Sequence, residues 1–100
     1  MKISVTKRAN QDFLKIQDYL ITNWGDSSVV KFKNQVNDFF DILEIFPEIG
    51  TMEVPEKNVR GFQVNSHIRI FYTIKNDSLV ILSFFNILQN PQKKNLGGKN

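Results

Sequence analysis

Residues 29–46 constrain the fold of this chain more than any other stretch. Apolar side chains recur there at alternating steps of three and four residues, at Val29, Phe32, Val36, Phe39, Leu43 and Phe46. That spacing lines one side of an α-helix, so it predicts a long helix with a single buried face. Pro47 follows directly, and the residue before a proline avoids helical backbone angles, so the helix is expected to end there.

A second helical pattern precedes this stretch and is joined to it by a very short turn. Its apolar residues also recur every three or four positions, at Phe13, Ile16, Leu20 and Trp24. Gly25 is expected to end the helix in a left-handed conformation. Asp26, Ser27 and Ser28 offer side-chain oxygens that would cap the next helix. Because the connection is short, the two helices are expected to form an antiparallel hairpin.

The remaining patterns are those of strands and a loop. Residues 3–6 alternate apolar and polar side chains and predict a first strand. Residues 47–58, with two prolines and a glycine, are interpreted as a loop. Short turns separate three further expected strands, at residues 59–64, 68–75 and 78–87. The fold class is thus predicted as α+β, in the order β-α-α-β-β-β, with the helical hairpin packed on one face of a mainly antiparallel sheet. The first strand must join that sheet at its edge or its centre.

Length and reactive side chains exclude several classes of protein. A chain of 100 residues is expected to form a single domain, here residues 1–94, with residues 95–100 as a flexible tail. The absence of cysteine excludes a disulfide scaffold and a thiol nucleophile, and a single histidine gives no metal-ligand cluster. No signal peptide or membrane span is recognisable. We expect a cytoplasmic protein without metal, cofactor or membrane contact.

The net charge of +3 is distributed unevenly along the chain. Residues 1–56 contain six Lys or Arg against nine Asp or Glu, a net charge of −3. Residues 57–100 contain seven Lys or Arg against one Asp, a net charge of +6. The second half of the chain is therefore the expected surface for an acidic partner.

Alternation along the strand at residues 68–75 sorts its side chains onto two faces. One face carries Ile68, Ile70, Tyr72 and Ile74, and this apolar set suits the core beneath the helices. Arg69, Phe71, Thr73 and Lys75 fall on the face that the helices leave uncovered. Charge beside an aromatic ring suits contact with nucleic acid or an acidic peptide, although such a face can also be simply solvated.

Other charged residues receive separate interpretations. Arg60 is expected to pair with Glu53 or Glu56, and His67 to be a turn residue rather than a base. Lys93 and Lys94 add positive charge near the end of the chain. The residues expected to bind a partner are Arg60, Arg69, Phe71, Lys75, Lys93 and Lys94.

Several strings, in this order, resemble the RelE/ParE superfamily of bacterial type II toxins over residues 2–94. They are A-x-x-D-F-L-x-I-x-x-Y-L-x-x-x-W-G at residues 9–25, F-P-E-I-G at 46–50, N-V-R at 58–60, I-R-I-F-Y at 68–72, N-D-S-L-V-I-L at 76–82 and Q-N-P-Q-K at 89–93. The resemblance implies the β-α-α-β-β-β fold and a cytoplasmic growth inhibitor that contributes to plasmid stabilisation. It also implies a cognate antitoxin as partner, with a homodimer or a toxin–antitoxin heterotetramer as the expected assembly.

The superfamily contains two activities, and the resemblance is closer to ParE-like toxins, which bind DNA gyrase and cleave nothing. RelE-like toxins cleave messenger RNA on the ribosome, and their phosphate-binding arginine matches Arg69. Their acid/base pair falls at Ile87 and Leu88 here, and neither side chain can transfer a proton. A non-catalytic gyrase inhibitor is therefore expected. A ribonuclease using Arg69, and an inactive interaction module with this fold, are the alternatives.

Overall fold

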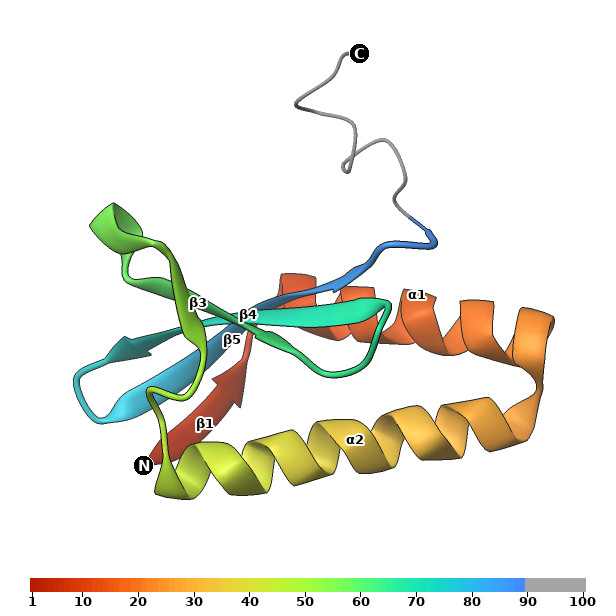
Figure 1. The fold of residues 1–100 in the computed structure, drawn as a ribbon, viewed down its shortest axis with the longest axis horizontal. Helices are drawn as coiled ribbons and strands as arrows, with labels where there is room; N and C mark the ends of the chain where they lie inside the picture. Colours follow the sequence, from red (N-terminus) through yellow and green to blue (C-terminus); the bar gives the residue numbers. More distant parts are fainter. Residues whose placement is uncertain (90–100) are drawn as a thin grey trace, which may run out of the picture.

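Two helices lie against one face of a five-stranded sheet in the computed structural model, which describes residues 1–89 (Figure 1). The elements are β1 (Lys2–Val5), α1 (Lys7–Trp24), α2 (Asp26–Ile45), β2 (Thr51–Val54), the 3₁₀ turn η1 (Pro55–Lys57), β3 (Val59–Gln63), β4 (Ile68–Lys75) and β5 (Ser78–Asn86). The predicted α+β class and element order are confirmed, with β2 as an additional strand. Lys93, Lys94 and the expected tail at 95–100 lie outside the described residues.

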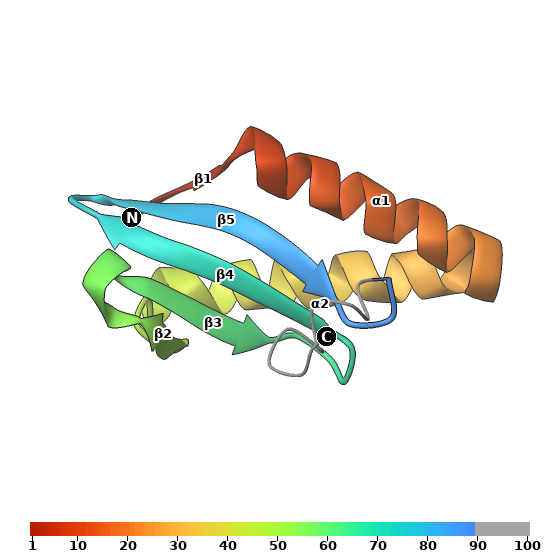
Figure 2. The same ribbon diagram turned by 90° about the horizontal axis from the view of Figure 1, so that it is seen from above.

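The strands are ordered β1-β5-β4-β3-β2 across the sheet, which Figure 2 shows from above. β3, β4 and β5 form the predicted antiparallel meander, and β2 extends it on one side. β1 takes the opposite edge and pairs in parallel with β5, Lys2 opposite Ser78 and Val5 opposite Ile81. The sheet therefore joins residues from the two ends of the described chain.

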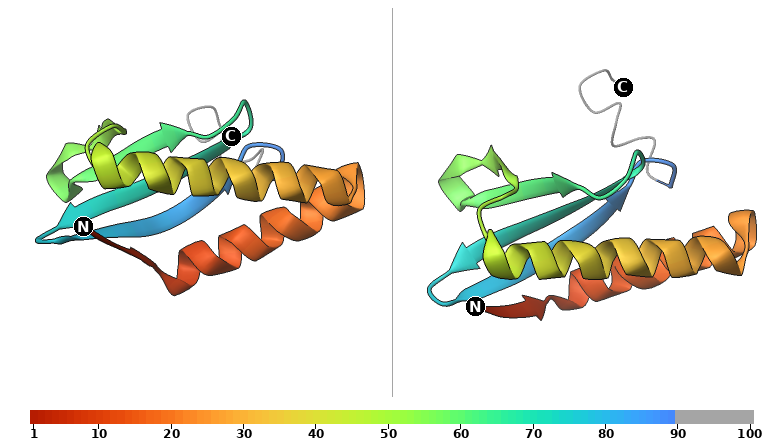
Figure 3. Two further views of the ribbon diagram at one scale, coloured as in Figure 1. Left: turned by 90° about the horizontal axis from the view of Figure 1, so that it is seen from below. Right: turned by 60° about the horizontal axis from the view of Figure 1, so that its bottom comes forward.

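The helical hairpin covers one face of the sheet (Figure 3). Thr6 begins α1, because its side-chain oxygen accepts a hydrogen bond from the Ala9 N–H at 3.0 Å. Gly25 has the expected positive φ of 87°, although its ψ of 177° is extended rather than left-handed helical. The predicted side-chain cap from Asp26, Ser27 or Ser28 is wrong: α2 begins at Asp26 after Gly25 without a side-chain cap, and the Ser28 hydroxyl donates to the Gly25 carbonyl at 2.7 Å. Neither helix in residues 1–89 combines the length and hydrophobicity needed to cross a bilayer.

The core lies between the hairpin and the middle strands. Five of the six residues in the predicted stripe of α2 are buried there: Val29, Phe32, Val36, Phe39 and Leu43. Phe46 is the exception, because the helix has already ended at Ile45 and its side chain is 62% exposed. From the sheet, Ile70, Tyr72, Leu79 and Ile81 are fully buried.

The uncovered face of β4 departs from simple alternation at one residue. Thr73 falls in the set expected on the open face, yet it is only 4% exposed. Its hydroxyl donates a hydrogen bond of 2.7 Å to the carbonyl of Asn58, the residue that follows η1 with a left-handed φ of 55°. Thr73 is therefore a buried structural residue and not part of a binding surface.

The segment between α2 and β3 is more ordered than the predicted loop, because it is fastened to Tyr72. The Gly50 N–H donates to the Tyr72 hydroxyl oxygen at 2.8 Å, and that hydroxyl donates to the Pro47 carbonyl at 2.9 Å. Burial of the ring raises the pKa of Tyr72 above its ordinary value of about 10. These bonds place Gly50 directly before β2, so that Thr51 and Met52 can pair with β3.

Candidate functional site

Arg69 lies near the start of β4, the central strand of the sheet, and has polar partners on β3 and, beyond it, on β2. Its guanidinium forms an ion pair with Glu53 of β2 and donates a hydrogen bond of 3.0 Å to the Gln63 Oε1 of β3. The guanidinium carbon also lies 6.0 Å from the centre of the Phe71 ring. Arg69 and Phe71 are therefore brought together as the strand pattern predicted.

Gly61 provides the space in which the ion pair lies. It is directly opposite Phe71 on β4 and Thr51 on β2. A Cβ added at Gly61 would lie 2.9 Å from both the Arg69 Nε and the Glu53 Oε2. The charged groups thus cross above a strand position that has no side chain. We call Glu53, Gly61, Gln63, Arg69 and Phe71 the open-face cluster.

The ion pair in this cluster is only partly accessible to solvent. The side chains of Arg69 and Glu53 are 26% and 31% exposed. The negative charge of Glu53 offsets the positive charge of Arg69, so the guanidinium is not free to attract a phosphate by itself. The arrangement nevertheless places the carboxylate of Glu53 beside the fixed cation of Arg69 on an open surface. Such a pair suits either recognition of a polar partner or acid/base chemistry.

Arg60 occupies the other face of the sheet, and its predicted ion pair is wrong. It lies opposite Tyr72 in the β3–β4 register, so its side chain projects toward the helix side. Its guanidinium donates to the carbonyls of Glu48 at 3.1 Å and Gly50 at 2.8 Å. Glu53 pairs with Arg69 instead. Arg60 therefore stabilises the segment before β2 and does not join Arg69.

The remaining predicted residues do not gather around Arg69 either. Lys75 is exposed at the far end of β4, six residues away, which corresponds to about 20 Å along a strand. His67 lies in the β3–β4 turn, as predicted, with its Nδ1 at 3.3 Å from the Ser66 hydroxyl oxygen. Within the part of the chain that is described, Arg69 therefore lies apart from the other cationic residues expected to bind a partner.

The end of β5 provides no proton-transferring side chain. Ile87 and Leu88 follow the strand, and Leu88 is 43% exposed. Across residues 1–89 no group of three or more His, Cys, Asp or Glu is placed to hold a metal ion.

Sequence reasoning missed Glu53, Gln63 and Gly61 as members of the cluster. Glu53 belongs to a strand of four residues between Gly50 and Pro55, and so short a run carries no clear alternation. Gln63 ends β3 and becomes relevant only once the register places it opposite Arg69. The one available signal was the glycine within a predicted strand, which often marks a close approach of other groups.

Comparison with known proteins gives the same fold. Among solved structures, the chromosomal ParDE TA system from P. aeruginosa superposes with a TM-score of 0.64 at 19% identity, covering 86% of this chain and 95% of that one. The YoeB/ParE toxin from Agrobacterium tumefaciens has a TM-score of 0.62 at 12% identity, and the match covers 86% of this chain and 98% of that toxin. No curated protein sequence is similar enough to the chain to count as a relative.

The family described as "ParE toxin of type II toxin-antitoxin system, parDE" matches residues 3–91, nearly the whole chain. The matched region contains both helices, β2 to β5, all of β1 but its first residue, and the open-face cluster. The chain therefore belongs to the ParE toxin family of type II toxin–antitoxin systems, within the RelE/ParE superfamily.

Proposed function

We propose that the chain inhibits growth in the cytoplasm by binding DNA gyrase, without cleaving RNA. The observation that carries this proposal is the pairing of Arg69 with Glu53, together with the apolar residues Ile87 and Leu88 after β5. A nuclease would use its arginine to hold the charge that develops on the phosphate. Here the positive charge of Arg69 is already matched by the carboxylate of Glu53, which suits a preformed binding surface.

Messenger RNA cleavage is the second candidate, and one observation favours it. Cleavage through the 2′-hydroxyl needs a base, a cation at the phosphate and an acid for the leaving oxygen. Glu53 beside Arg69 would supply the first two. Within residues 1–89 the end of β5 offers no acid, and loss of such a group costs about 10²–10⁴ in rate. Binding without cleavage is therefore the better supported function.

Substitutions in the open-face cluster separate the two candidates. Arg69→Gln is expected to raise the concentration that inhibits gyrase supercoiling at least about tenfold, because a hydrogen bond to a charged group contributes about 1.5–3 kcal/mol. Glu53→Gln keeps the shape of the cluster and removes only the carboxylate charge, so a binding toxin should keep most of its activity. Supercoiling assays with purified protein and growth after induction measure both effects.

Lys75→Gln is the matched control, because it removes one charge from the same strand and face at an exposed position. It should inhibit gyrase like the unmodified chain. New codon-positioned 5′ ends in transcripts after induction, abolished by Glu53→Gln, would establish the ribonuclease instead. Unimpaired growth together with a co-purifying antitoxin would establish the inactive module.

An antitoxin segment has an apolar site available between the two helices. A groove of about 290 Å³ is lined by Val5, Asn10, Phe13, Lys33, Val36, Asn37, Phe40 and Phe84. Leu14 and Val30 add exposed apolar area to the hairpin, at 47% and 58% exposed. We infer that the antitoxin lays an apolar stripe in this groove and extends acidic residues toward the basic half of the chain. The proposed assembly is a toxin–antitoxin heterotetramer, or a homodimer for the toxin alone.

A bulky charge in the groove should block the antitoxin without unfolding the toxin. Asn37 is exposed and lines the groove, so Asn37→Arg is expected to weaken antitoxin binding at least about tenfold through burial of an unpaired charge. Asn34→Arg is the matched control, since Asn34 is exposed on the same helix outside the groove. Co-purification with the product of the neighbouring gene measures binding. If both variants retained the antitoxin equally, the antitoxin would bind outside this groove.

A further inference from the structure

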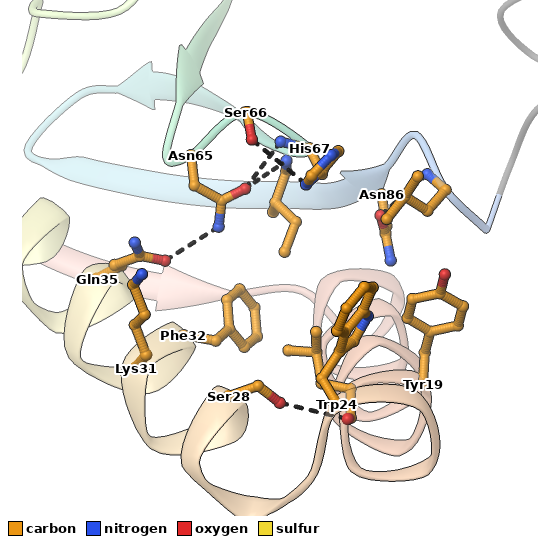
Figure 4. A pocket seen from close by; sticks show the side chains of 13 residues that line it. Tyr19, Trp24, Ser28, Lys31, Phe32, Gln35, Asn65, Ser66, His67 and Asn86 are labelled. Carbon is orange, nitrogen blue, oxygen red and sulfur yellow. Dashed lines mark hydrogen bonds between the residues drawn. The ribbon is translucent and has the colours of Figure 1, made fainter.

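A cleft of about 360 Å³ opens at the end of the molecule where the two helices meet the β3–β4 turn. Figure 4 shows its lining residues converging from α1, α2, the turn and the end of β5. The cleft lies on the helix side of the sheet and shares no lining residue with the open-face cluster or with the groove between the helices. Its volume falls within the range of about 300–1,000 Å³ typical of small-molecule sites.

Aromatic side chains form one wall of this cleft. Trp24 at the end of α1 lines it beside Tyr19 and Phe32 (Figure 4). Trp24 is the one tryptophan in the sequence, and it is 63% exposed although burial of so large a ring would be favourable. An exposed indole at the mouth of a cleft suits stacking against a planar ligand.

The opposite rim is held in place by hydrogen bonds. Asn65 in the β3–β4 turn donates from its side-chain nitrogen to the Gln35 Oε1 of α2 at 3.0 Å. Its side-chain oxygen accepts from the backbone N–H groups of His67 at 2.8 Å and Ile68 at 3.0 Å. The turn is thus fastened to the helix across the cleft, so the site is formed before any ligand binds.

The charge of the lining favours an anion. Lys31 contributes an ammonium group from α2, and the lining residues that the structure describes include neither Asp nor Glu. Within residues 1–89 Lys31 takes part in neither of the ion pairs. The exposed ring of His67 adds a second nitrogen-bearing group on the facing turn. A ligand with a negative group would meet attraction here and no opposing carboxylate.

We propose that this cleft binds a nucleoside phosphate, with its base stacked on Trp24 and its phosphate held by Lys31. An aromatic wall beside an unpaired cation matches a ligand that joins a planar ring to an anion, and base–aromatic stacking contributes about 1–3 kcal/mol. Such a ligand is either a free nucleotide or one nucleotide of a single strand. The assignment does not depend on gyrase as the target of the toxin.

Trp24 provides a direct readout of binding, because no other residue contributes tryptophan fluorescence. We expect AMP to change this fluorescence saturably, and inorganic phosphate or adenosine alone to bind at least about tenfold more weakly. A short oligo(dA) tests the second source. Tighter binding of the oligonucleotide than of AMP assigns the site to single-stranded nucleic acid, and the reverse order assigns it to free nucleotides.

Two substitutions test the named contacts. Lys31→Gln is expected to weaken AMP binding at least about tenfold. Lys7→Gln, at an exposed lysine of α1 outside the cleft, should leave AMP binding unchanged. Trp24→Ala should weaken binding measured by calorimetry. Absence of saturable binding up to about 10 mM AMP, or equal losses in the two lysine variants, would overturn the proposal.

Discussion

Replacing Gly50 with alanine is expected to lower the free energy of unfolding by about 2–5 kcal/mol, through overpacking and the disturbance of buried hydrogen bonds. The added Cβ would lie 2.7 Å from the Tyr72 hydroxyl oxygen and 2.8 Å from its Cε1. Tyr72 is fully buried and cannot move aside, since its hydroxyl is bonded to both Gly50 and Pro47. Denaturant unfolding with linear extrapolation measures the loss.

Gly61→Ala is the control for this prediction. There the added Cβ would also come within 3 Å of other atoms, at 2.9 Å from the Arg69 Nε and the Glu53 Oε2. Those atoms belong to the ends of flexible, partly exposed side chains, which can shift at little cost. We expect a loss of about 1 kcal/mol or less, mainly through the partly exposed ion pair. Equal losses at Gly50 and Gly61 would show that Tyr72 does not lock the segment before β2.

Phe39→Ala is expected to lower the free energy of unfolding by about 3–5 kcal/mol. Phe39 is 2% exposed, stacks on Phe62 with ring centroids 4.3 Å apart, and meets the edge of Tyr72 at 5.9 Å. Its removal opens a cavity between α2 and the sheet. Because whole domains are stable by only about 5–15 kcal/mol, this loss is a large fraction of the total free energy of unfolding, and denaturant unfolding measures it.

Phe46→Ala makes the same chemical change one step beyond the end of α2. Phe46 is 62% exposed, so its truncation should cost less than about 1 kcal/mol. Comparing the free energies of unfolding of the two variants shows which part of the predicted apolar stripe is buried and which part is exposed. A loss of several kcal/mol at Phe46 would mean that its side chain is covered in solution.

The helical hairpin was predictable because its signals are local and repeated. A stripe of six apolar residues, a proline and a glycine define two helices without any knowledge of the sheet. Spacing alone did not show where the buried stripe ends, because Phe46 has the correct spacing but lies after the last helical residue. The antiparallel meander was equally accessible, since short turns join its strands.

The open-face cluster could not be predicted in the same way, because it depends on register between distant strands. Arg69 and Phe71 were found from alternation within β4 alone. Glu53 reaches Arg69 only because β2 exists, and β2 exists because Gly50 is held by Tyr72, more than twenty residues further along the chain. The ion pair expected of Arg60 was wrong for the same reason: only the β3–β4 register shows that Arg60 lies opposite Tyr72, on the other face from Glu53.

The parallel pairing of β1 with β5 also determines when the molecule can be completed during synthesis. Lys2–Val5 leave the ribosome before the other described elements, but their partners at Ser78–Ile81 are among the last described residues to emerge. β5 is also the neighbour of β4, so an unfinished chain lacks support on one side of the strand that carries Arg69. The nascent toxin can form its hairpin early, yet the sheet can assemble only once translation has passed β5.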